Sequence, residues 1–194
     1  MESEFARWPH YYSDMELEVF APEWYLKGHA DEYSEKILSS KDNNESEYFV
    51  PKIKELIDEL TKEKKLGKID LIITIPKSDL TYSSTLDSVA SWTATYLKTK
   101  HENIIERLVS GRRNVGDNGA EKRFKQTDGS MKLKRKLEIN EKNILLIDDI
   151  KTTGMTLLES AKLLKEDGAE MIFCVCLGIS RNLQKFPLKK GCKK

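Results

Sequence analysis

Two adjacent acidic residues and a group of hydroxyl side chains lie close together near the middle of the C-terminal half. Asp148 and Asp149 follow the apolar run 144–147 and are separated by two residues from the segment TTGMT at 152–156. Carboxylates accept hydrogen bonds from the vicinal hydroxyls of a sugar, whereas threonine hydroxyls and backbone N–H groups donate to phosphate oxygens. An acidic pair followed by such a segment therefore predicts a site for a ribose 5-phosphate.

The elements on either side of this segment explain how it would be positioned. The run 144–147 is typical of a buried parallel strand, and the residues after 156 have the periodicity of a helix. In open α/β sheets, ligands bind beyond the carboxyl ends of strands. A helix N-terminus offers unpaired N–H groups and a partial positive charge, which favour phosphate. Gly154 would allow the backbone to approach the ligand closely.

The rest of the chain alternates between strand-like and helix-like segments. From residue 70 onward this alternation predicts an α/β fold, an open, mostly parallel, twisted sheet flanked by helices. Gly168 is expected to cap the helix that follows the acidic pair. The other predicted strands are 15–20, 70–75, 103–109, 137–139 and 170–178, and the predicted helices are 49–65, 83–98 and 155–167.

Length, charge and cysteine usage restrict the class of protein. The 194 residues suit one domain, with room for an appendage, and a net charge of +1 predicts no general attraction to nucleic acid or to a membrane. The N-terminus is acidic, so we expect no signal peptide, and no apolar run is long enough to span a membrane. Cys174 and Cys176 alternate along a strand pattern and are expected to be buried free thiols, which favours a reducing, cytoplasmic location.

The segment 144–156 resembles the 5-phosphoribosyl-1-pyrophosphate (PRPP) signature of type I phosphoribosyltransferases. That signature is an apolar strand, two acidic residues, two variable residues and a phosphate loop rich in threonine and glycine. The resemblance implies the type I phosphoribosyltransferase fold, with a variable hood built from the termini and a flexible basic loop. It divides the chain into a hood at 1–45, a core at 46–180 and a basic tail at 181–194.

The resemblance also implies a role for each part of the site. Asp148 and Asp149 would hold the ribose hydroxyls and a magnesium ion (Mg²⁺) that PRPP brings with it. The loop 111–136 carries nine basic residues against three acidic ones and would fold over the pyrophosphate. The residues expected at the 5-phosphate are Lys151, Thr152, Thr153, Gly154, Met155 and Thr156, and those expected at the pyrophosphate are Lys77, Ser78, Arg112, Arg113, Lys122 and Arg123.

By resemblance, the chain is expected to be a homodimeric enzyme of nucleotide metabolism. It would transfer phosphoribosyl from PRPP to a small nitrogenous heterocycle and release pyrophosphate. A second reading is a catalytically silent, PRPP- or nucleotide-binding regulator, in which the basic segment 132–136 and the tail make weak nucleic-acid contacts. A third is a non-transferase relative, such as a PRPP-synthetase-like protein, for which no ATP site is evident in the sequence.

One position in the signature restricts the class of acceptor base that we expect. Enzymes that act on 6-oxopurines usually carry an acidic residue where this chain has Thr152. Thr152 and an aspartate at the first acidic position, Asp148, are more similar to the orotate-type, adenine-type or competence protein F-like (orphan) members, and the last group has the pattern D-D-x-x-T-T-G-x-T. Aromatic residues in the N-terminal hood are expected either to stack on the acceptor base or to form the core of an appendage. The visible candidates are Trp8, Tyr11, Tyr12, Trp24 and Tyr25.

Overall fold

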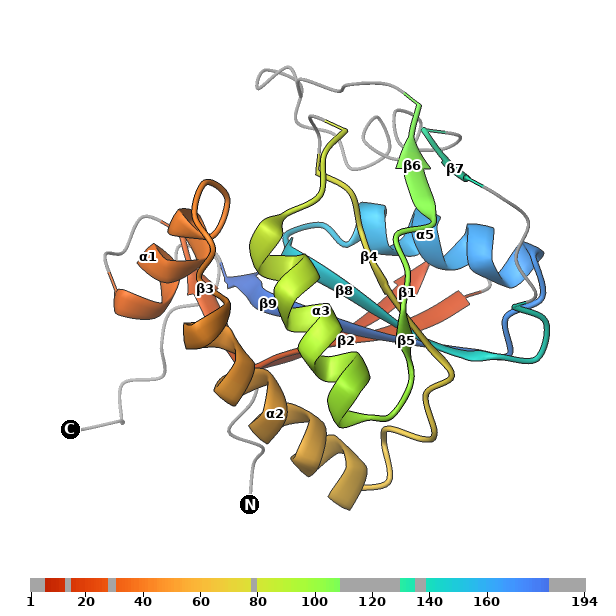
Figure 1. Cartoon of the computed structure of the whole chain (residues 1–194), viewed down its shortest axis with the longest axis horizontal. Coiled ribbons are helices and arrows are strands. Elements are labelled where there is room, and N and C mark those ends of the chain that lie inside the picture. Colours follow the sequence, from red (N-terminus) through yellow and green to blue (C-terminus); the bar gives the residue numbers. More distant parts are fainter. Residues whose placement is uncertain are drawn as a thin grey trace.

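A seven-stranded sheet forms the centre of the molecule (Figure 1). Its strand order is β1-β2-β9-β8-β4-β5, and β3 pairs with a later part of β9. The strands are β1 (Ala6–Tyr12), β2 (Met15–Ala21), β3 (Glu23–Leu26), β4 (Leu71–Thr74), β5 (Lys100–His101), β8 (Asn143–Lys151) and β9 (Met171–Arg181). The computed structural model describes residues 6–12, 15–27, 31–77, 80–108, 130–134 and 139–181.

Most strand pairs of this sheet are parallel. The neighbours β5, β4, β8 and β9 all run in the same direction, and β2 and β3 both pair with β9 in parallel. Among the described pairs of the seven-stranded sheet, only β1 and β2 are antiparallel. The predicted α/β fold with a mostly parallel sheet is therefore confirmed, and the predicted strand at 15–20 is present as β2.

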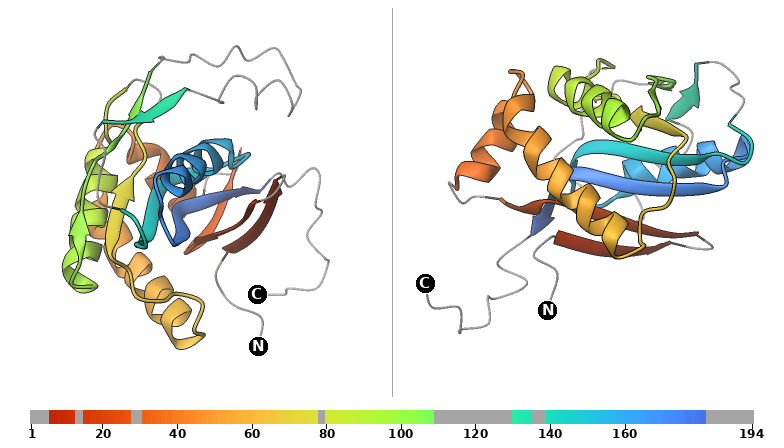
Figure 2. Two further views of the ribbon diagram at one scale, coloured as in Figure 1. Left: turned by 90° about the vertical axis from the view of Figure 1, so that its right-hand side faces the viewer. Right: turned by 60° about the horizontal axis from the view of Figure 1, so that its bottom comes forward.

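Helices cover both faces of the sheet, as the two views in Figure 2 show. The helices α1, α2 and α3 lie on one face, and α5 lies on the other. All three predicted helices are present, and Gly168 follows α5 with a φ of +99°, a value at which glycine is favoured. The helices are α1 (Glu32–Ser39), α2 (Ser46–Lys62), α3 (Ser84–Tyr96) and α5 (Met155–Glu166).

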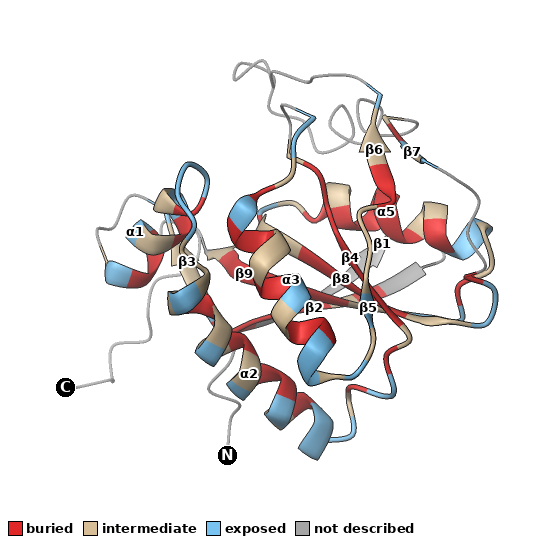
Figure 3. Ribbon diagram, in the orientation of Figure 1, coloured by how far each residue is buried: buried red, intermediate tan, exposed pale blue. Residues whose placement is uncertain are grey.

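The central strand β8 contributes side chains to the hydrophobic cores on both faces of the sheet. Ile144 and Leu146 belong to the core that packs on α5, whereas Leu145 and Ile147 belong to the core that packs on α1, α2 and α3. All four residues are fully buried, and Figure 3 shows the same burial along the neighbouring strands. A strand covered on both faces needs an uninterrupted apolar run, and this accounts for the sequence pattern at 144–147.

The first 45 residues contribute to this same sheet. The strands β1, β2 and β3 lie in it, and Tyr33 of α1 donates its hydroxyl proton to the backbone oxygen of Leu177 in β9. Asp31 caps α1 by accepting a hydrogen bond from the backbone N–H of Ser34 at 2.8 Å. The hood at 1–45 and the tail at 181–194 remain predictions, because strand pairing does not establish what these segments cover.

The region after α3 differs from the predicted arrangement. The two-residue strand β5 occupies the edge of the sheet, and the chain then leaves it to form a separate hairpin of β6 (Ile105–Arg107) and β7 (Met131–Leu133). The predicted strand at 103–109 is therefore present in part, as β6, but it pairs with β7 and not with the strands of the main sheet. Asn103 lies where the chain leaves the main sheet, and its side chain hydrogen-bonds to Thr74 at the end of β4 and to Asp87 of α3. Of the predicted strand 137–139, residues 137 and 138 lie outside the described residues.

The length and the apolar character of the helices can be compared with those of membrane-spanning helices. In the described part of the chain, no helix combines the length and the apolar character that crossing a membrane requires.

Candidate active site

The carboxyl ends of β4 and β8 bring two predicted parts of the site together. The two strands are in register up to Thr74 and Ile147, and the N–H of Ile75 donates to the carbonyl of Ile147 at 3.1 Å. The turn that begins at Pro76 therefore leaves the sheet beside Asp148. The N–H of Lys77 donates to the carbonyl of Thr81 at 2.7 Å. This neighbourhood is what the sequence predicts for two ligand-binding loops at one sheet edge.

The acidic pair lies on the last residues of a strand rather than after it. β8 stays paired with β9 through Lys151, whereas its pairing with β4 ends at Ile147. One oxygen of Asp148 accepts from the N–H of Asp149 at 2.9 Å, and one oxygen of Asp149 accepts from the N–H of Ile150 at 2.6 Å. Both side chains are half-buried. Because a carboxylate has about four acceptor positions, each keeps capacity for a ligand.

Burial and a neighbouring negative charge make Asp148 difficult to ionise. Burial raises the pKa of the Asp148 carboxyl well above its usual range, and the charge of Asp149 raises it further, while the positive charge of Arg107 acts in the opposite direction. The same environment includes Cys174 and Cys176, which are buried free thiols as predicted, and burial raises the pKa of each. A cation brought to this pair would relieve the repulsion between its carboxylates.

The predicted phosphate loop connects β8 to α5. Gly154 precedes the helix with a φ of +80°, in the left-handed region that favours glycine, and it has no side chain to accept from the first helical turn. The N–H of Met155 lies 3.5 Å from the hydroxyl oxygen of Thr153. Thr152 is exposed, and Thr156 is half-buried. This arrangement presents N–H groups and hydroxyls at the positive end of a helix, which suits a phosphate.

Lys151 is buried at the end of β8, unlike a lysine in a solvent-exposed loop. Only 4% of its surface is exposed, and burial lowers the pKa of its ammonium group to about 8. Its backbone belongs to the β8–β9 ladder opposite Ile179. Contact between Lys151 and the 5-phosphate therefore stays a prediction.

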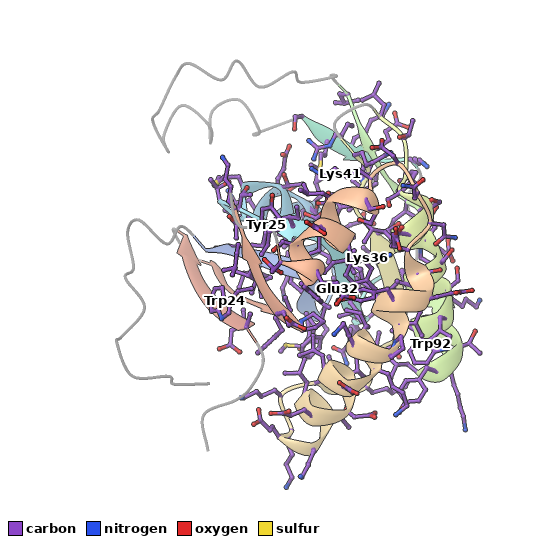
Figure 4. The ribbon with its side chains drawn as sticks, turned by 90° about the vertical axis from the view of Figure 1, so that its left-hand side faces the viewer. Trp24, Tyr25, Glu32, Lys36, Lys41 and Trp92 are labelled. Carbon is purple, nitrogen blue, oxygen red and sulfur yellow. The ribbon has the colours of Figure 1, made fainter. Side chains whose placement is uncertain are left out.

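Part of the predicted pyrophosphate site can be placed. Lys77 lies in the turn after β4, and its ammonium group is 3.4 Å from the backbone oxygen of Lys41, so the turn between α1 and α2 adjoins it. Figure 4 shows Lys41 on that turn and Lys36 on α1. The remaining predicted residues lie outside the described residues: Ser78, Arg112, Arg113, Lys122 and Arg123.

The hairpin β6–β7 carries two contacts that the sequence reasoning missed. Arg107 donates from Nε to the carbonyl of Pro76 at 3.0 Å. Glu159 of α5 accepts from the N–H of Ser130 at 2.7 Å, from the hydroxyl of Ser130 at 3.0 Å and from the N–H of Met131 at 3.1 Å. The available signal for Arg107 was a basic residue at the end of a strand-like segment, and for Glu159 it was an acidic residue among apolar helix positions.

The aromatic residues of β3 pack on opposite faces of the sheet. Trp24 packs against the core that includes α5, and Tyr25 packs against the core on the other face (Figure 4). The side chains of Trp8, Tyr11 and Tyr12 lie outside the described part. Stacking of any of these rings on an acceptor base stays a prediction.

The donor set at the acidic pair fits a metal ion that arrives with a substrate. Among the described residues, no group of three or more His, Cys, Asp or Glu side chains could hold a metal. Asp148 and Asp149 alone would be too few ligands for an all-protein cage. Mg²⁺ is usually bound by one or two carboxylates together with substrate phosphates and water, and two adjacent carboxylates match that pattern.

A family model identifies the chain. The model of the phosphoribosyl transferase domain matches residues 44–194, so the chain belongs to that family. No curated protein matches it.

Solved structures of phosphoribosyl-handling enzymes also resemble the chain. An adenine phosphoribosyltransferase has 14% identity and a TM-score of 0.49, with 93% of this chain and 87% of that chain covered. A hypoxanthine phosphoribosyltransferase from Staphylococcus aureus has 18% identity and a TM-score of 0.44, with 75% and 74% covered. A glutamine phosphoribosylpyrophosphate amidotransferase from B. subtilis has 16% identity and a TM-score of 0.39. Here 61% of this chain is covered, but the match spans only 24% of that larger enzyme.

Proposed function

We propose that the protein is a phosphoribosyltransferase, which uses PRPP and Mg²⁺ to transfer a phosphoribosyl group to a small nitrogenous heterocycle. The observation that carries the proposal is the meeting of three parts at one sheet edge. They are the turn at Pro76, the acidic pair of β8 and the left-handed Gly154 at the start of α5. Membership in the phosphoribosyl transferase domain family supports the same chemistry.

Each part has a distinct role in this proposal. Asp148 and Asp149 accept hydrogen bonds from the 2′- and 3′-hydroxyls of the ribose. The hydroxyls and N–H groups of 152–156 hold the 5-phosphate, with help from the positive end of α5. Lys77 and Ser78 bind the pyrophosphate, and the basic residues of the loop 111–136 act on it as a group. Bound Mg²⁺ would neutralise charge on the pyrophosphate as it leaves.

The protein contributes mainly position and electrostatic stabilisation. A ring nitrogen of the acceptor forms a bond to C1 of the ribose while the bond from C1 to pyrophosphate oxygen breaks. Pyrophosphate leaves with that electron pair, and the acceptor nitrogen loses its proton. Positive charge develops on the sugar between these events, so an acidic pair kept ionised by bound Mg²⁺ stabilises the transition state.

The acceptor that we propose is not a 6-oxopurine. In the enzymes that use those bases, an acidic residue at the position of Thr152 approaches the purine ring. Thr152 is exposed and carries no charge. An orotate-like, adenine-like or other unusual heterocycle fits this position better.

Release of pyrophosphate tests the proposal. The protein is incubated with PRPP, Mg²⁺ and each member of a panel of free bases, and pyrophosphate is measured with a coupled enzyme assay. Turnover with one base supports the proposal and names the acceptor. Tight PRPP binding without turnover for any base favours the PRPP-binding regulator instead. Absence of both PRPP binding and turnover contradicts the proposal.

A further inference from the structure

Arg107 occupies a position that joins three elements around the acidic pair. It is the last residue of β6, and its Nε donates to the carbonyl of Pro76 at 3.0 Å across 31 residues of sequence. That carbonyl belongs to the turn proposed to bind pyrophosphate. The guanidinium group therefore reaches from the hairpin to the carboxyl end of β4.

The charge of Arg107 acts on carboxylates from two further elements. Its positive charge opposes the rise in the pKa of Asp148 on β8 and of Glu159 on α5. The guanidinium group is planar and rigid, so a bond through Nε fixes the direction of its other N–H groups. Glu159 in turn accepts three hydrogen bonds from Ser130 and Met131 and so ties the other strand of the hairpin to α5.

The hairpin holds Arg107 on a stable base. Ile105 and Met131 are buried in the core that includes α5, and the N–H of Leu108 donates to the carbonyl of Ser130 at 2.8 Å. A side chain carried by such a base can fix a neighbouring turn, because its own backbone is ordered by packing and by pairing.

We propose that Arg107 is a positioning residue, which holds the turn after β4 at a set distance from the acidic pair before the substrate arrives. The inference deepens the proposed function and rests on it for the substrate concerned. Arg107 acts through the carbonyl of Pro76, so a lysine at this position would keep the charge but lose the Nε–H donor and the planar fork.

Two variants and one control test this role. Arg107→Gln removes the charge, and Arg107→Lys keeps it. Lys68→Met removes one positive charge from a lysine whose side chain is 84% exposed and which lies before β4, at the opposite end of the strand. The readouts are the affinity for PRPP with Mg²⁺ by calorimetry, amide hydrogen exchange over residues 75–82 by mass spectrometry, and the melting temperature.

For Arg107→Gln we expect a loss of PRPP affinity of about ten- to hundredfold, the range for one charge-assisted hydrogen bond. Arg107→Lys should show a smaller loss. Both variants should exchange faster at 75–82, with little change elsewhere. Lys68→Met loses only an exposed ion pair with Asp70, so it should match the wild type in PRPP affinity and in exchange at 75–82. A merely structural role would lower the melting temperature and raise exchange across the whole hairpin and α5 instead.

Two results would overturn the inference. One is an affinity within twofold of the wild type, together with unchanged exchange at 75–82, in both Arg107 variants. The other is a general rise in amide exchange across the whole protein in Arg107→Lys. This second test can still be made if Arg107→Gln does not fold. Failure of the wild type to bind PRPP would instead contradict the proposed function, and the exchange comparison would still decide whether Arg107 positions the turn.

Discussion

Glu159 gives the sharpest quantitative prediction for stability. Its side chain is buried, with 7% of the residue exposed, and it accepts three hydrogen bonds at 2.7, 3.0 and 3.1 Å from Ser130 and Met131. Glu159→Ala removes all three acceptor contacts. The buried N–H of Met131 then loses its partner, at about 1–3 kcal/mol, while the two half-buried donors of Ser130 can bond to water and lose about 0.5–1 kcal/mol each.

We therefore expect Glu159→Ala to lower the free energy of unfolding by about 3 kcal/mol. Glu159→Gln keeps an acceptor oxygen but loses the charge, and it should lose roughly half as much. Urea titration followed by tryptophan fluorescence and circular dichroism measures both values. The matched control is Glu166→Ala, because Glu166 is exposed on the same helix and has the same change in side chain.

Glu166→Ala makes the same change of side chain without removing a buried contact, and because Glu166 is the last residue of α5, helix propensity contributes less there than at Glu159. Exposed substitutions usually change stability by about 0.5 kcal/mol or less. If Glu159→Ala and Glu166→Ala differ by less than that amount, the anchoring of the hairpin to α5 through Glu159 is refuted.

Three further predictions concern single positions. Gly154→Ala places a Cβ at a φ of +80°, so it should destabilise the protein by about 1–2 kcal/mol in urea unfolding. It should also weaken PRPP binding in calorimetry. Wild-type values in both measurements would argue against a need for glycine in the predicted phosphate loop. Tyr33→Phe removes the hydroxyl that donates to Leu177, and urea unfolding should show a loss of about 1 kcal/mol; no loss would show that this bond contributes nothing. Burial lowers the pKa of His101 below its usual 6.5, so the folded state favours the neutral imidazole. The contribution of His101 to stability is therefore complete above pH 6.5 and is lost as the pH falls from 6.5 to the folded pKa. The wild type should thus lose more unfolding free energy than His101→Asn between about pH 7.5 and 5.5, and equal losses would contradict the assignment.

The central part of the fold could be predicted from the sequence because local pattern and tertiary role agree there. Residues 144–147 are apolar without interruption, since they are covered on both faces, and Gly154 stands where the backbone needs a positive φ. A strand, a turn and a helix with these features can be recognised without knowing what packs around them. The acidic pair and the phosphate loop were predicted for that reason.

The hairpin and its contacts could not be predicted in the same way. β5 and β6 are short, and Asn103 between them bonds to Thr74 and Asp87, which are distant in sequence. Arg107 and Glu159 likewise bond to residues 31 and 29 positions away. No periodicity in a single sequence encodes such pairs, because they arise only after the sheet has assembled.

Calorimetric titration of PRPP with Mg²⁺ tests the central claim most directly, with the wild type and the double variant Asp148→Asn, Asp149→Asn compared side by side. Asparagine keeps the size of each side chain and removes its charge. The proposal predicts that the wild type binds and that the double variant loses at least about a hundredfold in affinity, because two charge-assisted contacts to the ribose are lost. Unchanged affinity in the double variant would contradict the assignment of the acidic pair to the ribose, and no binding by the wild type would contradict the PRPP site itself.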